Sequence, residues 1–176
     1  MAKLEILTAP HPILNQKALP VEQVDDEVRR LMDDMLETMY ENNAVGLAAN
    51  QVGILKRILV LDLQNDDDDK NRPKDFYPLF IANPEISESE DEFIEAKEAC
   101  LSVPEQVVEV KRPAGIKITY LDYYNEKREL AADGWLARAI LHEVDHLDGK
   151  LIINYLSNLK RDIVLKKLIK LKKISV

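Results

Sequence analysis

The five residues from His142 to His146 have the types and spacing needed to bind a metal ion and activate water. The run reads His-Glu-Val-Asp-His. Residues four apart share one face of a helix, so both imidazoles can bind a single metal ion. Glu143 lies about 100° around the helix from His142, which places its carboxylate beside the metal, where it can take a proton from water. The alternative is a structural helix whose two histidines find partners inside the core.

The single cysteine, Cys100, is a candidate third ligand. A catalytic metal usually takes three protein ligands and a water molecule, so two histidines do not complete the set. Cys100 lies upstream of the histidines, in the run Glu98–Pro104. An unpaired cysteine considered alone is more often a small buried hydrophobic residue. If it does bind the metal, one thiolate with two imidazoles suits Fe(II), Zn, Co or Ni and disfavours Mg and Ca.

The segment from Ala44 to Gly53 is rich in small residues and contains Gln51. Glycines and alanines let a ligand or another backbone approach closely. Gln51 offers a neutral hydrogen-bond donor, which suits a developing oxyanion and does not compete for the metal. Taken alone, the segment favours a plainer interpretation, a helix C-terminus followed by a tight turn.

The elements that position these residues follow from hydrophobic periodicity. Apolar residues at three- and four-residue spacing predict a first helix, capped by Asp25 or Asp26, whose buried face would hold Val28, Leu31, Met32, Met35, Leu36 and Met39. Further helices are expected at about Gly134–Asp148, stopped by Gly149, and about Ser157–Lys173. The β-rich runs are Arg57–Asp62, Leu79–Asn83, Val107–Lys111 and Gly115–Tyr123, with a hairpin turn at Tyr124–Lys127 and a twisted edge strand at Ser87–Ala96.

This segregated order of helix, strands, helix and helix predicts an α+β fold with mostly antiparallel sheets around a central, buried, metal-binding helix. A helical wheel places Trp135 on the same half of that helix as the candidate ligands, and leaves only Arg138 and Asp145 as a polar strip. Buried ionisable groups are costly unless they are paired or bind a metal. The inward-facing triplet of His142, Glu143 and His146 is therefore better explained by a site than by a core.

Length and composition predict one domain over residues 1–176. The formal net charge of −8 argues against nucleic-acid binding over the whole surface. One cysteine excludes an internal disulfide and suggests a reducing compartment. No apolar run is long enough to cross a membrane, and no signal peptide is recognisable. We expect a soluble, cytoplasmic protein, and a monomer.

Four consecutive aspartates, Asp66–Asp69, lie in a polar stretch between two predicted strands. Like charges repel and add nothing to a core, so we expect a solvated surface loop. A divalent-cation site is the alternative, although the spacing matches no known calcium loop.

Three segments together resemble the peptide deformylase family. Members of that family have three motifs in order: Gly-hydrophobic-Gly-Leu-Ala-Ala-x-Gln, Glu-Gly-Cys-Leu-Ser and His-Glu-x-x-His. The similar segments of this chain are Ala44–Gln51, Glu98–Ser102 and His142–His146. The resemblance extends through Pro10–Leu14 and Asn83–Ile86, and reaches about Leu151. It implies an enzyme that removes the N-formyl group from the initiator methionine of nascent chains.

The resemblance also implies a role for each site residue. Cys100, His142 and His146 would bind the metal, which is Fe(II) in the cell and replaceable by Ni, Co or Zn. Glu143 would act as general base and then as general acid. Gln51 and the backbone N–H of Leu101 would hold the oxyanion, and Gly46 would present its backbone to N-formyl-Met peptides. Departures from the family pattern are Ala44, Ala99, Val107 and Leu141; if the position of Ala99 needs a positive φ, alanine there would be strained.

Two other functions compete. A zinc peptidase can use the same His-Glu-x-x-His helix, but its third ligand normally lies downstream. From Gly149 onward the chain has no histidine, and its one acidic residue is Asp162. A non-catalytic binding protein would be expected to have lost Glu143 or a ligand, and neither is missing.

The predicted C-terminal helix, about 157–173, is basic on an acidic protein. Val164, Leu168 and Leu171 form an apolar strip, while Lys166, Lys170 and Lys173 fall on the opposite side. One interpretation is a solvated amphipathic helix that closes the domain. The other, suggested by the family resemblance, is a ribosome contact whose strength would fall steeply with salt.

Overall fold

The structure, a computed structural model, describes residues 3–174 and has the expected α+β architecture. Its helices are α1 (Asp26–Glu41), α2 (Gly134–Leu147) and α3 (Asn158–Ile174). Its strands are β1 (Gly46–Ala48), β2 (Ile58–Leu61), β3 (Leu79–Ser89), β4 (Phe93–Cys100), β5 (Val103–Pro113), β6 (Gly115–Leu121) and β7 (Lys127–Asp133). All pairings between these strands are antiparallel, and they form a five-stranded sheet in the order β1-β2-β3-β6-β7 and a separate two-stranded hairpin of β4 and β5.

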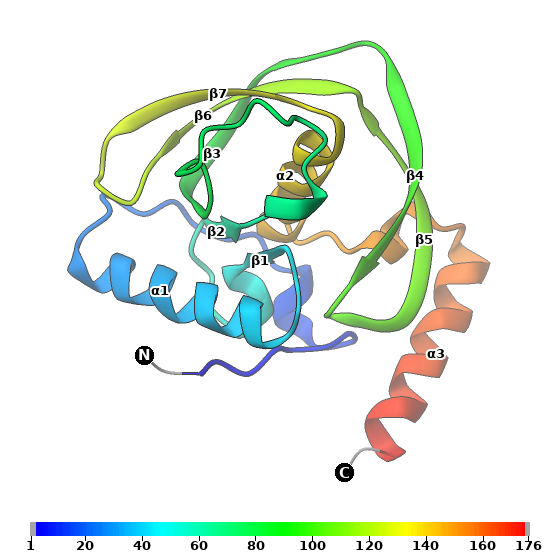
Figure 1. Ribbon diagram of the computed structural model, residues 1–176. Helices are drawn as coiled ribbons and strands as arrows, with labels where there is room; N and C mark the ends of the chain where they lie inside the picture. Colours follow the sequence, from blue (N-terminus) through cyan, green and yellow to red (C-terminus); the bar gives the residue numbers. More distant parts are fainter. Residues whose placement is uncertain (1–2, 175–176) are drawn as a thin grey trace.

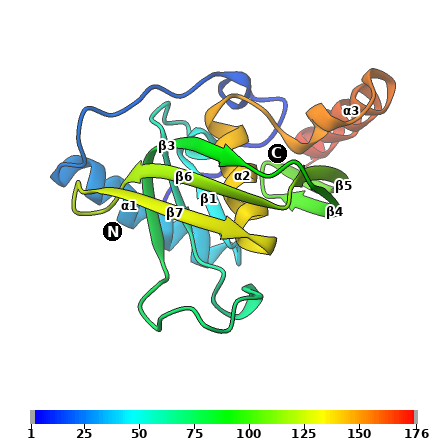
Figure 2. The same cartoon turned by 90° about the horizontal axis from the view of Figure 1, so that it is seen from above.

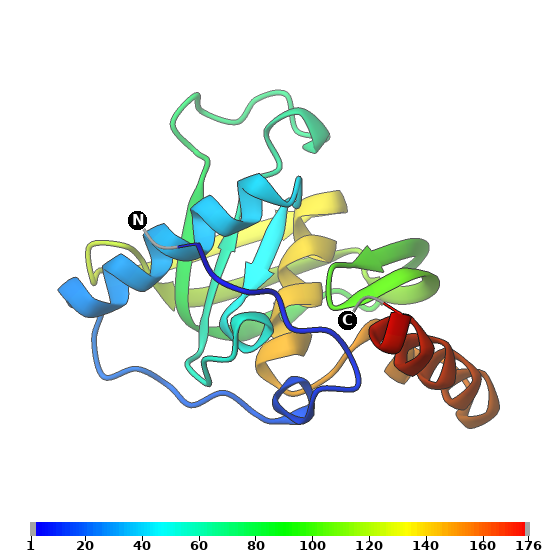
Figure 3. The same cartoon turned by 90° about the horizontal axis from the view of Figure 1, so that it is seen from below.

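Helix α2 is central, as expected. Figures 1 and 3 show it between the five-stranded sheet and the β4–β5 hairpin, with α1 on the far side of β1 and β2. Its apolar residues Leu136, Ile140 and Leu147 are fully buried in one cluster with residues of β2, β3 and β6. The helix stops at Gly149, whose φ is 77° and where a Cβ would lie 2.7 Å from the backbone oxygen of Asn15. Glycine meets both the left-handed backbone and the close approach.

Helix α1 confirms its predicted cap and core face. The Asp25 carboxylate accepts a hydrogen bond from the backbone N–H of Val28 at 2.9 Å, which satisfies one of the free donors of the first turn. The buried methionines of α1 pack against β1 and β2 in a second apolar cluster, whose fully buried members are Met32, Met35, Met39, Leu47, Ala49, Ile58, Val60 and Ala82.

The β4–β5 hairpin differs from the prediction. Ser87–Ala96 is not one edge strand: it spans the end of β3, a break, and the start of β4. Strand β5 begins at Val103, earlier than the predicted Val107. The two strands are joined by the two residues Leu101 and Ser102, with Cys100 opposite Val103. The many charged residues of β4 obscured its strand pattern in the sequence. Backbone pairing with β5 stabilises the strand, although its composition does not favour one.

The aspartate-rich loop is not wholly solvated, so that prediction is wrong for one residue. Asp67 is only 5 % exposed. Its carboxylate accepts hydrogen bonds from the Tyr77 hydroxyl at 2.5 Å and from Arg72 Nε at 3.1 Å. These partners neutralise the charge and satisfy its oxygens, which is what lets a carboxylate be buried. Figure 2 shows the loop projecting from the body of the molecule.

Helix α3 packs by the predicted strip. Leu168 is buried, and Val164 and Leu171 are partly buried, in a third apolar cluster with residues of β5 and the N-terminal segment. Lys166, Lys170 and Lys173 are exposed. Within residues 3–174, no helix is both long enough and apolar enough to cross a membrane.

Candidate metal centre and active site

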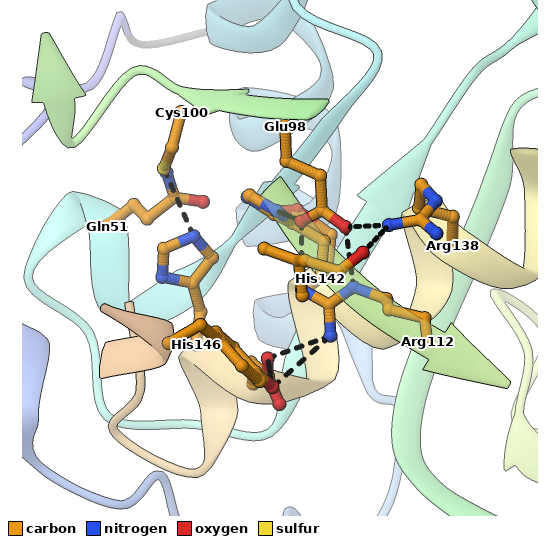
Figure 4. A network of polar contacts seen from close by, with 11 residues as sticks. Gln51, Glu98, Cys100, Arg112, Arg138, His142 and His146 are labelled. Atoms are coloured by element: carbon orange, nitrogen blue, oxygen red, sulfur yellow. Dashed lines mark hydrogen bonds and ion pairs between the residues drawn. The ribbon is translucent and has the colours of Figure 1, made fainter. Parts of the chain in front are cut away.

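The three predicted metal ligands meet at one point. Cys100 comes from the end of β4, and His142 and His146 come from adjacent turns of α2 (Figure 4). One ligand atom from each residue lies within 4.8 Å of the other two. The distance from Cys100 Sγ to His146 Nε2 is 3.3 Å. Two imidazoles and a thiol at this spacing fit a borderline-soft divalent metal.

No other group of this kind occurs among the described residues. A search of residues 3–174 for three or more His, Cys, Asp or Glu side chains able to share a metal finds only this triad. The alternative of a cation site in the Asp66–Asp69 loop therefore gains no support. The alternative of two histidines satisfied within the core also weakens, because in the described structure His146 Nδ1 is buried without a hydrogen-bond partner.

Glu143 lies beside the triad with its carboxylate shielded from water. Its Oε1 is 3.9 Å from His142 Nε2, and its Oε2 is buried with no hydrogen-bond partner among the described residues. Burial raises the pKa of Glu143 to about 7, because the charged form loses its hydration. A carboxylate with a pKa near neutrality can both accept and return a proton at physiological pH.

Gly46, at the start of β1, packs directly against this carboxylate. A Cβ at Gly46 would lie 3.0 Å from Glu143 Oε2 and 2.8 Å from the Leu61 side chain. The second distance is too short for real carbon atoms, so any larger residue would displace Leu61 or the carboxylate. The glycine is required here by a close approach and not by backbone conformation.

Gln51 reaches the triad from the segment that follows β1. It belongs to a short 3-10 helix, Ala49–Val52, that follows β1 and ends at Gly53. A helix C-terminus followed by a turn describes only the end of this short helix, since α1 already ends at Glu41 and β1 comes between them. Gln51 Oε1 accepts a hydrogen bond from the backbone N–H of Ala48 at 3.0 Å, while its Nε2 lies 3.6 Å from Cys100 Sγ and 3.1 Å from Ser102 Oγ. The fixed amide therefore points its donor toward Ser102 and the candidate ligand Cys100.

Leu101 occupies the two-residue turn of the hairpin, next to Cys100. All of the predicted site residues are consequently near one another: Gly46 and Gln51 from the β1 region, Cys100 and Leu101 from the hairpin, and the remaining three from α2.

Sequence reasoning missed Glu98, which contacts the candidate ligand His142. Its Oε1 accepts a hydrogen bond from His142 Nδ1 at 2.8 Å (Figure 4). This contact leaves Nε2 of the same ring free to face the metal. Glu98 also accepts hydrogen bonds from Arg112 Nε at 2.6 Å and from Arg138 Nη1 at 2.7 Å. A signal was present, because Glu98 is two residues before Cys100 on one strand, but its partners are distant in sequence.

The charges around Glu98 explain its acidity. Burial alone would raise the pKa of Glu98, but hydrogen bonds from Arg112 and His142 outweigh it and hold the pKa at about 2. The same centre thus contains two buried carboxyl groups with opposite shifts. Glu98 is a permanent anion that orients His142, whereas Glu143 titrates near pH 7.

The histidines also shift in opposite directions. Burial would lower the pKa of His142, but hydrogen bonds to Cys100 and Glu98 and the charge of Glu143 raise it well above its ordinary value. Burial and the neighbouring His142 lower the pKa of His146. Since a ligating imidazole must be neutral, a metal at this centre competes with a proton on His142.

Two predictions about the surface of α2 need correction. Trp135, placed on the inner half, is 48 % exposed at the first turn of the helix. Arg138 and Asp145 do form a polar strip, but the strip faces the hairpin: Arg138 is only 7 % exposed, and Asp145 Oδ2 accepts a hydrogen bond from Arg112 Nη1 at 2.9 Å. The helical wheel could not reveal that the neighbouring element supplies charges of opposite sign.

The departures from the family pattern leave the site intact. Neither Ala44 nor Ala99 is among the described non-glycine residues with positive φ, so alanine is unstrained at both positions. Leu141 is buried in the core around α2. Val107 is 63 % exposed on β5, at the side of the hairpin facing solvent.

Comparison with known proteins agrees with this geometry. The family model described as polypeptide deformylase matches residues 3–162. The peptide deformylase 1 of Rickettsia conorii is 61 % identical over 172 residues, which cover 98 % of this chain and 98 % of that protein. A crystal structure of peptide deformylase from Ehrlichia chaffeensis superimposes with a TM-score of 0.90 at 41 % identity, covering 99 % of each chain.

A second structure of the Ehrlichia chaffeensis protein, in complex with actinonin, also has a TM-score of 0.90, at 42 % identity, with 97 % of this chain and 98 % of that chain covered. The match of the family model, the full-length identity and the shared fold agree with one another. The chain belongs to the polypeptide deformylase family.

Proposed function

We propose that this chain hydrolyses the N-formyl group from the N-terminal formyl-methionine of newly made proteins and releases formate. The observation that carries the proposal is the meeting of Cys100, His142 and His146 at one point, with the Glu143 carboxylate beside them. Family membership supports the reaction, and the geometry supports the assignment of roles.

Cys100, His142 and His146 would hold one divalent metal, and we propose Fe(II) as the metal in the cell, with Zn, Ni or Co able to replace it. One thiolate and two imidazoles favour these metals over Mg or Ca. When bound, the metal would supply Lewis-acid polarisation of the formyl oxygen and lower the pKa of water.

The chain's own residues would handle the proton and the developing charge. Glu143 accepts the proton of the attacking water and returns it to the leaving amine, a double task that suits a pKa of about 7. The Gln51 side-chain amide and the backbone N–H of Leu101 hold the oxyanion. Gly46 presents its backbone to the formyl-Met peptide, and the lack of a side chain there keeps Glu143 in place.

The zinc-peptidase alternative is disfavoured by the position of the third donor. Cys100 completes the triad from upstream of α2, and the search of residues 3–174 finds no other such group. Formate is small, so a closed space beside the proposed metal would admit a formyl group and exclude larger acyl groups.

We propose one catalytic domain over residues 1–176, acting as a cytoplasmic monomer on nascent chains. The exposed lysines of α3 support a contact with the ribosome, where formylated chains emerge. Neutralising phosphates with lysines releases counterions, so such a contact should weaken as salt rises.

The decisive experiment compares the wild-type protein with Glu143→Gln, both purified without oxygen. We expect about one equivalent of metal in each, formate release from a formyl-Met peptide by the wild type, and a loss of turnover of about 10²–10⁴-fold in the variant, because an amide cannot accept a proton. Cleavage of internal peptide bonds without formate release would favour the peptidase. Turnover by Glu143→Gln equal to that of the wild type would exclude Glu143 as the base.

A further inference from the structure

The metal donors are carried by two separate parts of the fold. Cys100 lies on the β4–β5 hairpin, and the histidines lie on α2. The hairpin is not paired with the five-stranded sheet. Figure 1 shows it as a separate arm to one side of α2. The distance between thiol and imidazoles therefore depends on what joins the arm to the helix.

The buried apolar side chains of the hairpin and of α2 fall into separate clusters. The buried apolar residues of the hairpin, Val103, Val108 and Val110, belong to a cluster shared with the N-terminal segment, the 151–153 region and α3. The buried apolar residues of α2 belong to a different cluster, shared with the five-stranded sheet. No described buried residue is common to the two clusters.

Arg138 bridges this gap from one turn before His142. Its Nη1 donates to Glu98 Oε2 at 2.7 Å and to the backbone oxygen of Val110 at 2.9 Å, and its Nη2 donates to the backbone oxygen of Ile94 at 2.5 Å. One guanidinium on α2 thus donates hydrogen bonds to the backbones of both strands and to the carboxylate that contacts His142. Its planar fork fixes direction as well as distance.

Arg112 makes the reciprocal connection, from β5 to Asp145 on α2, and it also pairs with Glu98 on β4. Arg112 lies on β5 itself and reaches α2 through the Asp145 side chain, whereas Arg138 reaches from α2 to backbone oxygens of both strands. The two arginines balance the carboxylates of Glu98 and Asp145, which makes burial of Arg112, Arg138 and Glu98 tolerable.

We propose that Arg138 is a positioning residue: it holds the β4–β5 hairpin against α2 and thereby sets the distance from Cys100 to the two histidines. The inference rests on the metal-binding role proposed above. It goes beyond that role, because it makes the distances between the metal donors depend on a residue that is not itself a ligand.

The test measures Co(II) binding, because the thiolate-to-cobalt absorption band reports the Cys100 bond and not only activity. Wild type, Arg138→Met and Arg138→Lys are titrated without oxygen against a competing chelator. The control is Arg29→Met, since Arg29 also joins two elements through a carboxylate and carbonyl oxygens, those of Asp26, Val24 and Tyr123, far from the metal centre.

We expect Arg138→Met to raise the Kd for Co(II) about 10–100-fold and to weaken or shift the thiolate band, as loss of an orienting group typically does. Arg138→Lys can still pair with Glu98 but cannot reach both strands, so its Kd should be intermediate. Arg29→Met should bind as the wild type does. If Arg138→Met does not fold, Arg138→Lys decides the question.

Wild-type Kd and an unchanged band in the folded arginine variant would overturn the inference and leave the metal role standing. An equal loss of affinity in Arg29→Met would also overturn it, because general destabilisation would then explain the effect. Absence of a thiolate band in the wild type would instead overturn the metal role, and the inference with it.

Discussion

The contact of helix α1 with β1 and β2 and the contact of helix α2 with the β4–β5 hairpin use opposite chemistry. The apolar joint, between α1 and strands β1 and β2, is built from methionine, leucine, isoleucine and valine side chains. The polar joint, between α2 and the β4–β5 hairpin, is built from two arginines and two carboxylates, namely Arg112, Arg138, Glu98 and Asp145. The metal donors lie across the polar joint.

The difference shows how one fold separates stability from precision. Apolar contacts are non-directional and contribute free energy in proportion to the area they bury. Buried ion pairs add little net stability, because desolvation offsets their attraction, but their hydrogen bonds fix distance and angle. A hydrolytic centre whose proposed ligands come from two elements needs fixed distances and angles more than it needs additional stability.

The largest expected effect is on the apolar joint. Met35 is fully buried in α1, so Met35→Ala should lower the free energy of unfolding by about 2–5 kcal/mol through lost burial and a residual cavity. Chemical denaturation measures the loss. Cobalt affinity of the folded fraction should stay at the wild-type value; a weakened thiolate band in this variant would show that the two joints are not separable.

Glu98→Gln tests the polar joint in the same two assays. The amide keeps the shape but removes the charge that faces Arg112, Arg138 and His142. We expect metal affinity to fall about 10–100-fold, with slower turnover at limiting metal. Recovery of turnover at saturating metal would mark Glu98 as orienting a ligand. Unchanged affinity would contradict that role.

The two buried carboxyl groups should respond to pH in opposite directions in metal-free protein. Because the folded pKa of Glu143 is raised from 4.5 to about 7, the folded state binds the extra proton between these values, and stability is lost as pH rises through that window. Because the pKa of Glu98 is lowered from 4.5 to about 2, its contribution is present above 4.5 and is lost as pH falls toward 2.

Metal-free Glu143→Gln should accordingly be more stable than the wild type at pH 8, by about 1–3 kcal/mol, and equal to it near pH 4. Urea denaturation of both proteins at the two pH values measures the difference. A variant that is less stable than the wild type at pH 8 would mean that the Glu143 carboxylate has a stabilising partner.

The smallest effect concerns α3, which lies outside both joints. The exchange of Lys166, Lys170 and Lys173 for glutamate should weaken co-sedimentation with ribosomes at low salt and leave peptide turnover unchanged. This variant is preferable to removal of α3, because removal would also take away the buried side chain of Leu168. The matched control exchanges three exposed lysines elsewhere, Lys17, Lys74 and Lys127. Equal loss of co-sedimentation in both variants would show that the overall charge of the protein, and not a contact made by α3, determines ribosome binding.

The features predicted well from the sequence depend on neighbours in the chain. Asp25 caps α1 through Val28, three residues away, and Gly149 stops α2 by its own backbone conformation. The His142–His146 spacing places two ligands on one helix face without further information. Local geometry is the same wherever such residues occur.

The features that were missed depend on partners far along the chain. Asp67 is buried only because Tyr77 and Arg72 fold back over it. Glu98 contacts His142, which is 44 positions further along the chain, and Arg138 faces inward because the hairpin places backbone oxygens opposite it. Charged residues suggest solvent when their partners are unknown, so a sequence pattern alone assigns Arg138 to the surface.

One contact of the C-terminal helix has a consequence for the timing of maturation. Cys100 packs at the edge of the apolar cluster that includes Leu168 of α3. During synthesis α3 leaves the ribosome after every other described element, so the support behind the cysteine is completed last. An incomplete chain would present both histidines while its thiol was still loosely held. Binding of the proposed metal should therefore follow the emergence of α3 from the ribosome.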